Sequence, residues 1–422
     1  MEKNFKIPFT FYLARTFSLL HSFLVDRTLV FALGSSDHIC CRSAHFSLAA
    51  YFTGNSRKQR HIETENSVCS CKHDVDRNCS VFIDLRTSRT FRNSIMIIKK
   101  TGYHGLYFPE LGVSLDGYHP EADYAFVSHA HADHMPRNRN TKAYATSATL
   151  DLMERRGFRG EKNVLKFHEQ FESDQFRATL YPAGHILGSA MIYLETEQGT
   201  LLYTGDYKTP PSPATEGFDA PEQVDLLITE ATFGLPIYRW EPLEKLKKDI
   251  QDFAVSSLDD GYTPIFLGYN LGKAQEIMHM LAPLNLPLMI HGAGFKLCDV
   301  YENHGIHLGN YSTYVREECE GKILVTPSSA LSKGFASNVS KTRVAYCSGW
   351  ASNESRRTQL TADKLIPLSD HLDFFELIRF CKELSPKKVY VTHTPNPDVV
   401  QHYLEKEGID SSFMNFEYEA ED

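Results

Sequence analysis

The stretch "VSHAHADHMPR", residues 127–137, follows a short apolar segment and places His129, His131, Asp133 and His134 within six positions. Residues i and i+2 at the end of a strand point to the same side, so His129 and His131 can bind one metal ion. Asp133 and His134 follow in the turn, where the chain points elsewhere. We therefore expect two ions side by side, each bound by one pair, rather than a histidine-rich loop without metal.

Two later residues are candidate ligands of the same site. His185 lies in "YPAGHILGSA" (181–190), a glycine-flanked loop between apolar strands, and Asp206 follows the strand in "LLYTGDYK" (201–208). A carboxylate can bridge two ions about 3.5–4 Å apart, as in two-metal hydrolases. The predicted cofactors are two divalent metal ions; zinc is the first choice and manganese the alternative, because both use His and Asp ligands.

The composition is that of an ordinary globular chain. With 422 residues and 42% hydrophobic content, it can form more than one domain. The net charge of -9 argues only weakly against nucleic acid, because metals and a few local Lys and Arg residues can hold phosphates. No apolar run reaches the ~18 residues of a membrane span, so we expect no membrane association. The later cysteines are scattered, which suits a reducing cytoplasm.

Residues 1–95 differ from the rest. Through Ser94 there are 13 Lys and Arg against eight Asp and Glu, a net charge of +5, whereas the remainder carries -14. Five of the nine cysteines also lie there. We expect this segment to be disordered or an artefact of an upstream start codon, because a self-consistent strand pattern begins at Met96.

The periodicity changes along the rest of the chain. Residues 96–240 are rich in short strands, with one helix expected at 147–157. Residues 241–341 alternate helix and strand in the rhythm of a small parallel sheet. Strands and helices resume at 342–422. This pattern predicts one α/β domain, made of 96–240 and 342–422, that is interrupted by a second α/β domain.

The chain resembles the metallo-β-lactamase superfamily. Asp116 in "VSLDG", the stretch "SHAHADH", His185 and Asp206 match the first four motifs of that superfamily in order. The resemblance implies an αββα sandwich, in which Asp116 orients the ligands rather than binding metal.

Three later residues resemble the motifs of the β-CASP branch, whose members are nucleases acting on DNA and RNA. They are Glu230 in "ITEATFG", His371 in "PLSDHLDFFEL" and His393 in "VYVTHTP". The resemblance implies that 241–341 is the β-CASP cap domain and that His393 completes the second metal site. It also implies that Glu230 orients His371, the general acid toward the leaving oxygen, while Asp133 helps to position the nucleophile.

Other stretches look like the bacterial ligase-associated DNA exonuclease family. The most specific are "TFGLPIYRW" (232–240) and "GYNLGKAQ" (268–275), and the resemblance covers about 100–420. It implies a DNA substrate and work beside a DNA ligase and a helicase. His393 points the other way, because the RNA-processing type of β-CASP protein carries histidine there and the DNA cross-link repair type carries valine.

Several cationic or aromatic residues are candidates for substrate binding. Lys273 stands at a helix start whose free N–H groups suit a phosphate. The other candidates could hold the strand, with the indole as a stacking platform: Lys208, Arg239, Trp240, Arg356 and Arg357.

The combined prediction is a dinuclear metal phosphodiesterase, a DNA exonuclease of DNA repair that uses a metal-activated water. The main alternative is an RNA-processing β-CASP ribonuclease. A thioester or lactam hydrolase fits less well, because such enzymes lack the inserted domain and the Glu230/His371 pair. A metal-bound but inactive scaffold is the remaining alternative, against which the complete ligand set argues.

Overall fold

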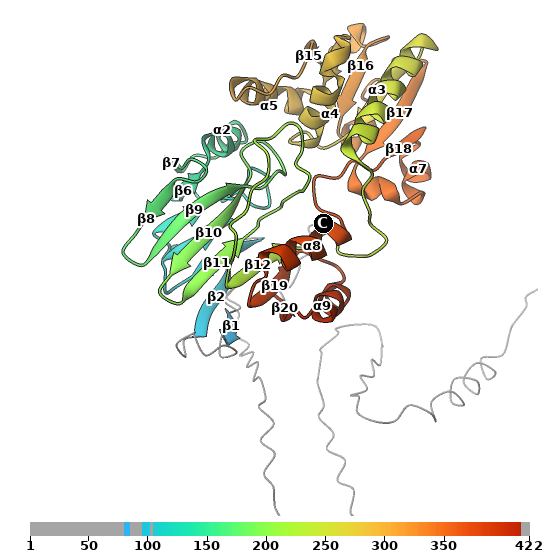
Figure 1. The fold of residues 1–422 in the computed structure, drawn as a ribbon. Helices are drawn as coiled ribbons and strands as arrows, with labels where there is room; N and C mark the ends of the chain where they lie inside the picture. Colours follow the sequence, from blue (N-terminus) through green and yellow to red (C-terminus); the bar gives the residue numbers. More distant parts are fainter. Residues whose placement is uncertain (1–79, 85–94, 102–103, 415–422) are drawn as a thin grey trace, which may run out of the picture. The chain divides into compact units, whose positions relative to one another are not determined.

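The computed structural model describes residues 80–84, 95–101 and 104–414, and its first sheet forms one layer of a sandwich (Figure 1). The strands of this sheet follow chain order: β1 (Ser80–Asp84), β2 (Ile95–Thr101), β3 (Gly105–Phe108), β4 (Val113–Leu115), β5 (Tyr124–Phe126), β6 (Lys142–Ala145) and β7 (Glu161–Val164). Strands β1 to β4 pair antiparallel, and β4 to β7 pair parallel.

The second sheet has the order β20-β19-β12-β11-β10-β9-β8. Its strands are β8 (Gln170–Glu172), β9 (Phe176–Pro182), β10 (Ala190–Thr196), β11 (Gly199–Tyr203), β12 (Leu226–Glu230), β19 (Lys388–Thr392) and β20 (Ser411–Phe413). Strands β8 to β11 pair antiparallel, and β11, β12, β19 and β20 pair parallel. Strand β12 is buried along its whole length, as expected for a central strand that is covered on both faces.

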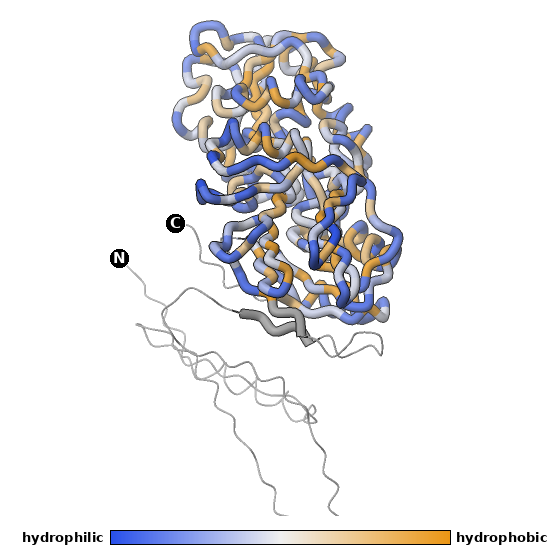
Figure 2. Tube along the Cα trace, turned by 90° about the vertical axis from the view of Figure 1, so that its left-hand side faces the viewer, coloured by the Kyte–Doolittle hydropathy of each residue, from blue (hydrophilic) through white to orange (hydrophobic). Residues whose placement is uncertain are grey.

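The core of the sandwich lies between these sheets. Strand β9 alternates buried and more exposed residues, so Phe176, Ala178 and Leu180 face inward and pack with Phe126 of the first sheet. The opposite face of the second sheet is covered by α8 (Phe374–Leu384) and α9 (Pro397–Lys406). Figure 2 shows hydrophobic segments in the interior of the described chain and hydrophilic segments on its outer loops.

A third sheet is entirely parallel, with the order β15-β14-β16-β13-β17-β18. Its strands are β13 (Thr263–Leu267), β14 (Leu288–Ile290), β15 (Tyr311–Thr313), β16 (Ile323–Thr326), β17 (Thr342–Cys347) and β18 (Lys364–Ile366). The accompanying helices are α3 (Leu243–Asp259), α4 (Lys273–Leu281), α5 (Gly292–Asn303), α6 (Ser328–Leu331) and α7 (Ser355–Leu360), with short 3-10 turns at 282–284, 316–318 and 349–352. The predicted αββα sandwich with an inserted α/β domain is confirmed.

The inserted sheet extends beyond residue 341, where the sequence pattern ended it. Strand β17 pairs with β13, Thr342 opposite Thr263, and β18 pairs with β17. We therefore propose that the cap ends near Ile366. The sequence of an apolar strand does not show to which domain it belongs, because the strands with which it pairs are distant in sequence.

The two domains share one hydrophobic core. It joins α2 (Ser147–Arg155), which lies against β6 and β7, to helices of the cap through side chains such as Leu152, Ile277 and Leu297. Burial of apolar surface on both sides holds the domains together where the functional residues lie.

Most of residues 1–95 lies outside the described residues, so the expectation for that segment stays a prediction. Its described part is mainly Ser80–Asp84, and this forms β1 by pairing with β2 instead of being disordered. Among the helices that the structure describes, none is long and apolar enough to cross a bilayer. Cys298, Cys319, Cys347 and Cys381 are free and buried.

Candidate metal and nuclease site

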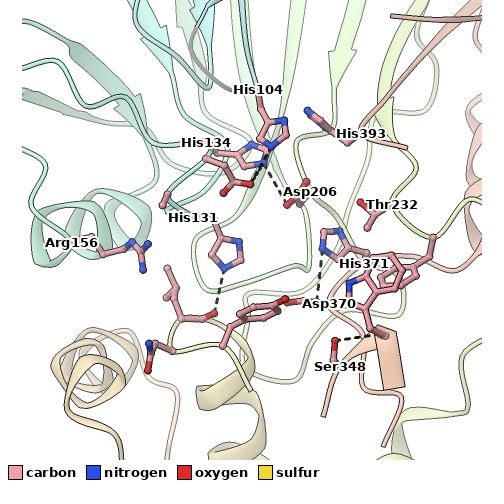
Figure 3. A pocket seen from close by; sticks show the side chains of 18 residues that line it. His104, His131, His134, Arg156, Asp206, Thr232, Ser348, Asp370, His371 and His393 are labelled. Atoms are coloured by element: carbon pink, nitrogen blue, oxygen red, sulfur yellow. Dashed lines mark hydrogen bonds and ion pairs between the residues drawn. The ribbon is translucent and has the colours of Figure 1, made fainter. Parts of the chain in front are cut away.

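The candidate functional residues follow the ends of parallel strands in both sheets. Ligands bind at the carboxyl ends of such strands because the chain leaves the sheet there. The residues are Asp116 after β4, His129 after β5, Asp206 after β11, Glu230 at the end of β12 and His393 after β19. The motifs that are far apart in sequence therefore meet around one pocket, which Asp206 and His393 line (Figure 3).

Three histidine nitrogens converge at the first donor group. His131 Nδ1 lies 3.1 Å from His129 Nε2 and 3.1 Å from His185 Nε2. The outer nitrogens face acceptors: His185 Nδ1 donates to the carbonyl of Asp370 at 2.7 Å, and His131 Nε2 faces that of Leu271 at 3.3 Å. The inner nitrogens therefore carry lone pairs that face one another, an arrangement that a cation between them would stabilise.

The first group is kept neutral by its surroundings. Burial lowers the pKa of His129, His131 and His185. Neighbouring histidines lower the pKa of His129 and of His185 further. Ser128 donates its hydroxyl to Asp116 Oδ2 at 2.5 Å, so its oxygen accepts from His129 Nδ1 at 2.9 Å. Neutral imidazoles with a fixed outer N–H are the form that binds a metal.

Asp206 lies between the two donor groups. Its Oδ2 is 3.5 Å from His129 Nε2, 3.7 Å from His185 Nε2 and 3.5 Å from His134 Nε2. Glycine precedes it because a Cβ at Gly205, with φ of +53°, would lie 2.5 Å from Ser128 Oγ. The carboxylate therefore faces both groups, which is the position expected of a bridging ligand.

The second donor group is built around Asp133 and His134, and His104 lies beside them. His134 Nδ1 donates to Asp116 Oδ2 at 2.8 Å, which leaves Nε2 facing Asp206. Burial lowers the pKa of His134, but Asp206, Asp116 and Asp133 outweigh burial and raise it to about 10. These carboxylates favour a cation at Nε2, either a proton or a metal ion.

His104 was not predicted from the sequence. Its Nε2 lies 3.2 Å from Asp133 Oδ2, and its ring stacks on His134 with a centroid distance of 4.9 Å. In "TGYHGLYF" it stands apart from other ligand-type residues, so no spacing marked it.

His393 lies at the edge of the second group. Its ring meets His104 edge-on with centroids 3.9 Å apart, yet among the described residues no set of donor atoms within 4.8 Å includes it. Thr392 donates its hydroxyl to the Thr229 carbonyl, so its oxygen accepts from His393 Nδ1 at 3.1 Å. The remaining Nε2 is buried with no hydrogen-bond partner in the described chain. A buried nitrogen lone pair without a partner is suited to binding a metal ion. The backbone of His393 has a left-handed φ of +50°, which orients the side chain.

The donor set therefore fits divalent metal ions. In each of the five histidines His129, His131, His134, His185 and His393, one ring nitrogen faces an acceptor, which leaves the other free. Metal-binding histidines almost always make this outer hydrogen bond, because it sets the tautomer and the orientation of the ring.

A carboxylate–imidazole pair lies beside these groups. His371 Nδ1 donates to Glu230 Oε1 at 2.7 Å, and Glu230 also accepts from the backbone of Thr232 and Tyr207. Burial lowers the pKa of His371, but Glu230 and Asp206 outweigh it and raise the pKa to about 10. The centroid of its ring is 5.0 Å from that of His185. A protonated Nε2 is therefore available at the pocket wall.

Trp240 holds the loop of His371 instead of offering a free stacking surface. Its indole N–H donates to the carbonyl of His371 at 2.9 Å, and its backbone N–H donates to Asp373. The ring packs against Phe233. Aromatic residues that do line the pocket are Phe233, Tyr269 and Trp350.

Lys208 and Lys273 lie in a buried ion network and not on a phosphate-binding surface. Both are at most 5% exposed; Lys208 Nζ is 3.0 Å and Lys273 Nζ 2.6 Å from the carboxylate of Glu276. Lys273 is also 3.9 Å from Asp370. The helix start at Lys273 is capped as well, because Gly272 donates its N–H to the side chain of Gln275. The network joins the cap to the loop of His371, and its lysines are paired with carboxylates of the protein itself.

The remaining predicted substrate contacts lie outside the pocket lining among the described residues. Arg239 stacks over Phe375. Arg356 donates to Gln359, and Arg357 pairs with Glu354. Sequence alone could not separate these three arginines from Arg156, which does line the pocket.

The fold and the donor set together define the class. A two-sheet sandwich whose strand ends carry two adjoining His/Asp groups, closed by an inserted α/β domain, is a metallo-β-lactamase fold with a β-CASP cap. No protein-family model matches the chain.

Comparison with known proteins gives the family. The chain is 36% identical over 293 residues to a "Probable DNA ligase" of Opitutus terrae, a match covering 69% of this chain and 28% of that protein. It is 32% identical over 181 residues to an "RNase J-like protein" of Methanocaldococcus jannaschii, covering 37% of this chain and 42% of that protein. An "Endoribonuclease YSH1" of Gibberella zeae is 32% identical over 122 residues, covering 28% of this chain and 14% of that protein.

These matches span less than half the length of the curated relatives. A crystal structure of a protein of unknown function from Enterococcus faecalis V583 shares the fold, with a TM-score of 0.51 and 12% identity over 81% of this chain and 98% of that one. The chain belongs to the β-CASP branch of the metallo-β-lactamase superfamily, near the ligase-associated proteins.

Proposed function

We propose that the protein is a metal-dependent phosphodiesterase, a DNA exonuclease of DNA repair. The observation that carries this proposal is the Glu230–His371 pair, whose carboxylate and imidazole lie 2.7 Å apart beside the two donor groups. Hydrolysis of a phosphodiester needs a proton for the leaving oxygen, and this pair holds one at the pocket wall.

We propose that His129, His131 and His185 hold one divalent ion, that Asp133, His134 and His393 hold a second, and that Asp206 faces both. When bound, such ions lower the pKa of a water molecule and stabilise charge on phosphate oxygens. The histidine-rich set favours zinc, with manganese as the alternative.

The chain's own residues supply orientation and proton transfer. Asp116 receives hydrogen bonds from Ser128, His134 and Tyr203, so one buried carboxylate aligns ligands of both groups. Asp133, with a half-exposed side chain, can orient a water molecule at the open side of the site. His371 Nε2 donates its proton to the leaving oxygen, and Glu230 stabilises the cationic ring until then.

DNA is the preferred substrate in this proposal. Of the three relatives described above, the one named as a DNA ligase matches this chain over the most residues, 293. A DNA ligase and a helicase are the proposed partners, and the cytoplasm is the proposed location. The second candidate is a β-CASP ribonuclease, which is favoured by the relatives named as ribonucleases and by His393.

The test is digestion of 5′- and 3′-end-labelled single-stranded and double-stranded DNA and RNA of matched sequence. The chelated protein is assayed first and then after addition of Zn²⁺ or Mn²⁺. We expect metal-dependent release of mononucleotides from DNA. Faster cleavage of RNA would support the second candidate, and internal fragments would exclude an exonuclease.

A matched variant ties the activity to this site. His371→Ala should lose cleavage while metal analysis finds the same bound metal as in the unaltered protein. Cleavage that persists in the variant would exclude His371 as the proton donor.

A further inference from the structure

A basic groove adjoins the candidate active site. The active-site pocket has a volume of about 580 Å³, and a second cavity of about 590 Å³ shares three of its lining residues, Ala132, Arg156 and Asn270. We propose that this groove, defined by Arg137, Arg155, Arg156 and Lys296, binds the phosphate backbone of the nucleic-acid single strand next to the nucleotide being cleaved. The proposal rests on the proposed nuclease function.

The lining of the groove is positively charged. Four of its 12 lining residues are Arg or Lys, and among the described residues no Asp or Glu lines it. Arg155 pairs with Asp299 at the rim, where both are about half exposed. The chain after Ser94 carries a net charge of -14, so the groove is positively charged although the protein around it is acidic. A local positive groove on an acidic protein attracts a polyanion to one place.

Arg156 connects the groove to the active site. It lines both cavities, and Figure 3 shows it at the side of the pocket that holds His131. Its Nε is buried without a hydrogen-bond partner in the described chain. Burial lowers the pKa of Arg156 and Asp133 raises it. A phosphate between the two cavities would supply the missing acceptor, and the guanidinium fork suits phosphate oxygens.

Both domains contribute to the groove. Arg137, Arg155 and Arg156 belong to the sandwich, whereas Lys296 lies on α5 of the cap. Helices α2 and α5 are joined by a hydrogen bond from His304, at the end of α5, to Asp151 at 3.0 Å, and by the ion pair of Arg155 with Asp299. The two helices that carry Arg155 and Lys296 are therefore held beside each other when no substrate is bound, which reduces the entropy cost of binding.

The occupant is a single strand rather than a free anion. A site for one phosphate needs one cluster of donors, whereas these cations spread over a cavity that continues into the pocket. The exposed Ala132 and Ala293 and the half-buried Met135 add apolar surface suited to sugars and bases. Single-strand sites combine such cations with aromatic surfaces, and Tyr269 and Trp350 line the adjoining pocket.

The test compares a double variant, Arg137→Ser with Lys296→Ser, with a control that has the same charge change, Lys166→Ser with Lys382→Ser. The control residues are exposed and are not among the described residues that line the two cavities. Two substrates are used: thymidine 5′-p-nitrophenyl phosphate, which fills only the pocket, and a 12-nucleotide single-stranded DNA. Binding of a 12-mer with phosphorothioate linkages is measured against salt concentration.

We expect the groove variant to hydrolyse the small diester at the rate of the unaltered protein. The kcat/KM for the 12-mer should fall on the order of tenfold or more, and the slope of log affinity against log salt should become shallower by about 1.4, or about 0.7 per phosphate contact. Arg156→Gln should weaken 12-mer binding further. Equal 12-mer affinity and salt slope in groove and control variants would overturn the proposal.

The two proposals fail in different ways. If the unaltered protein hydrolyses neither substrate with any metal, the nuclease function fails, while the binding of the phosphorothioate 12-mer still tests the groove. If inorganic phosphate competes as well as the 12-mer at equal phosphate concentration, the groove binds only single anions and the strand assignment is wrong. Thermal unfolding of both double variants should match the unaltered protein, since the changed side chains are exposed.

Discussion

The two donor groups lie next to each other, yet the protein holds them differently. His129 and His185 are almost fully buried, and backbone carbonyls of Leu271 in the cap and Asp370 fix the rings of His131 and His185. In the second group the side chain of Asp133 is 45% exposed and is held by His104, a side chain. The first group is therefore preorganised by both domains, whereas the second is open to the pocket.

This difference predicts how the metals behave. An ion in the first group should exchange slowly because three fixed rings enclose it. An ion in the second group should be the one that solvent, chelator and substrate reach first. Four substitutions test this contrast, and they are given in order of decreasing effect.

Asp206→Ala should have the largest effect, because its carboxylate faces both groups. Activity should fall below detection and bound metal should drop in both sites, more than the about 10–100-fold that loss of an outer partner causes. Metal content by mass spectrometry and cleavage of labelled DNA check this. Asp174→Ala, an exposed aspartate, is the control. Retention of one full metal equivalent would show that Asp206 serves a single group.

His371→Ala should lower kcat by about 10²–10⁴-fold, which is the usual contribution of a general acid. The metal content should stay the same, because the ring belongs to neither donor group in the proposal. Single-turnover cleavage beside metal analysis separates the two effects. A parallel loss of metal would instead make His371 part of the first group.

His104→Gln should weaken the second metal by about 10–100-fold and leave the first unchanged. The reason is that Asp133 would lose the ring that holds its carboxylate at 3.2 Å. Chelator titration followed by metal analysis should show the second ion leaving at lower chelator concentration. His168→Gln, which faces Asp219 away from the pocket, is the control. A uniform loss of both ions would contradict the separation of the groups.

Trp240→Phe should have the smallest effect. It removes the N–H that bonds the His371 carbonyl but keeps an aromatic ring against Phe233. One such bond contributes about 0.5–1.5 kcal/mol, so kcat should fall up to about tenfold at constant metal content. Tyr238→Phe, on the same Phe233 ring, is the control. An equal fall in kcat for Tyr238→Phe, which keeps the ring and removes only a hydroxyl, would show that the loss is not specific to the hydrogen bond between Trp240 and His371.

Local pattern was enough to predict much of this protein. The alternation of His129 and His131 at a strand end predicted a metal site, and the change to a βαβ rhythm at 241 predicted one α/β domain interrupted by another. The αββα sandwich followed from the resemblance of the motifs to a known superfamily. These features depend on neighbours within a few residues, so they can be read along the chain. The roles of the predicted ligands stay predictions.

Interactions between residues far apart in sequence could be identified only in the folded protein. Lys273 and Lys208 lie 65 positions apart and share Glu276, which turns two expected phosphate contacts into a buried network. His104 reaches Asp133, and Arg156 reaches the pocket, with no spacing signal. By itself the sequence determined which chemistry the chain carries. Packing between the two domains determined which of its charges face the substrate, because burial and neutralisation are properties of the folded contacts and not of residue type.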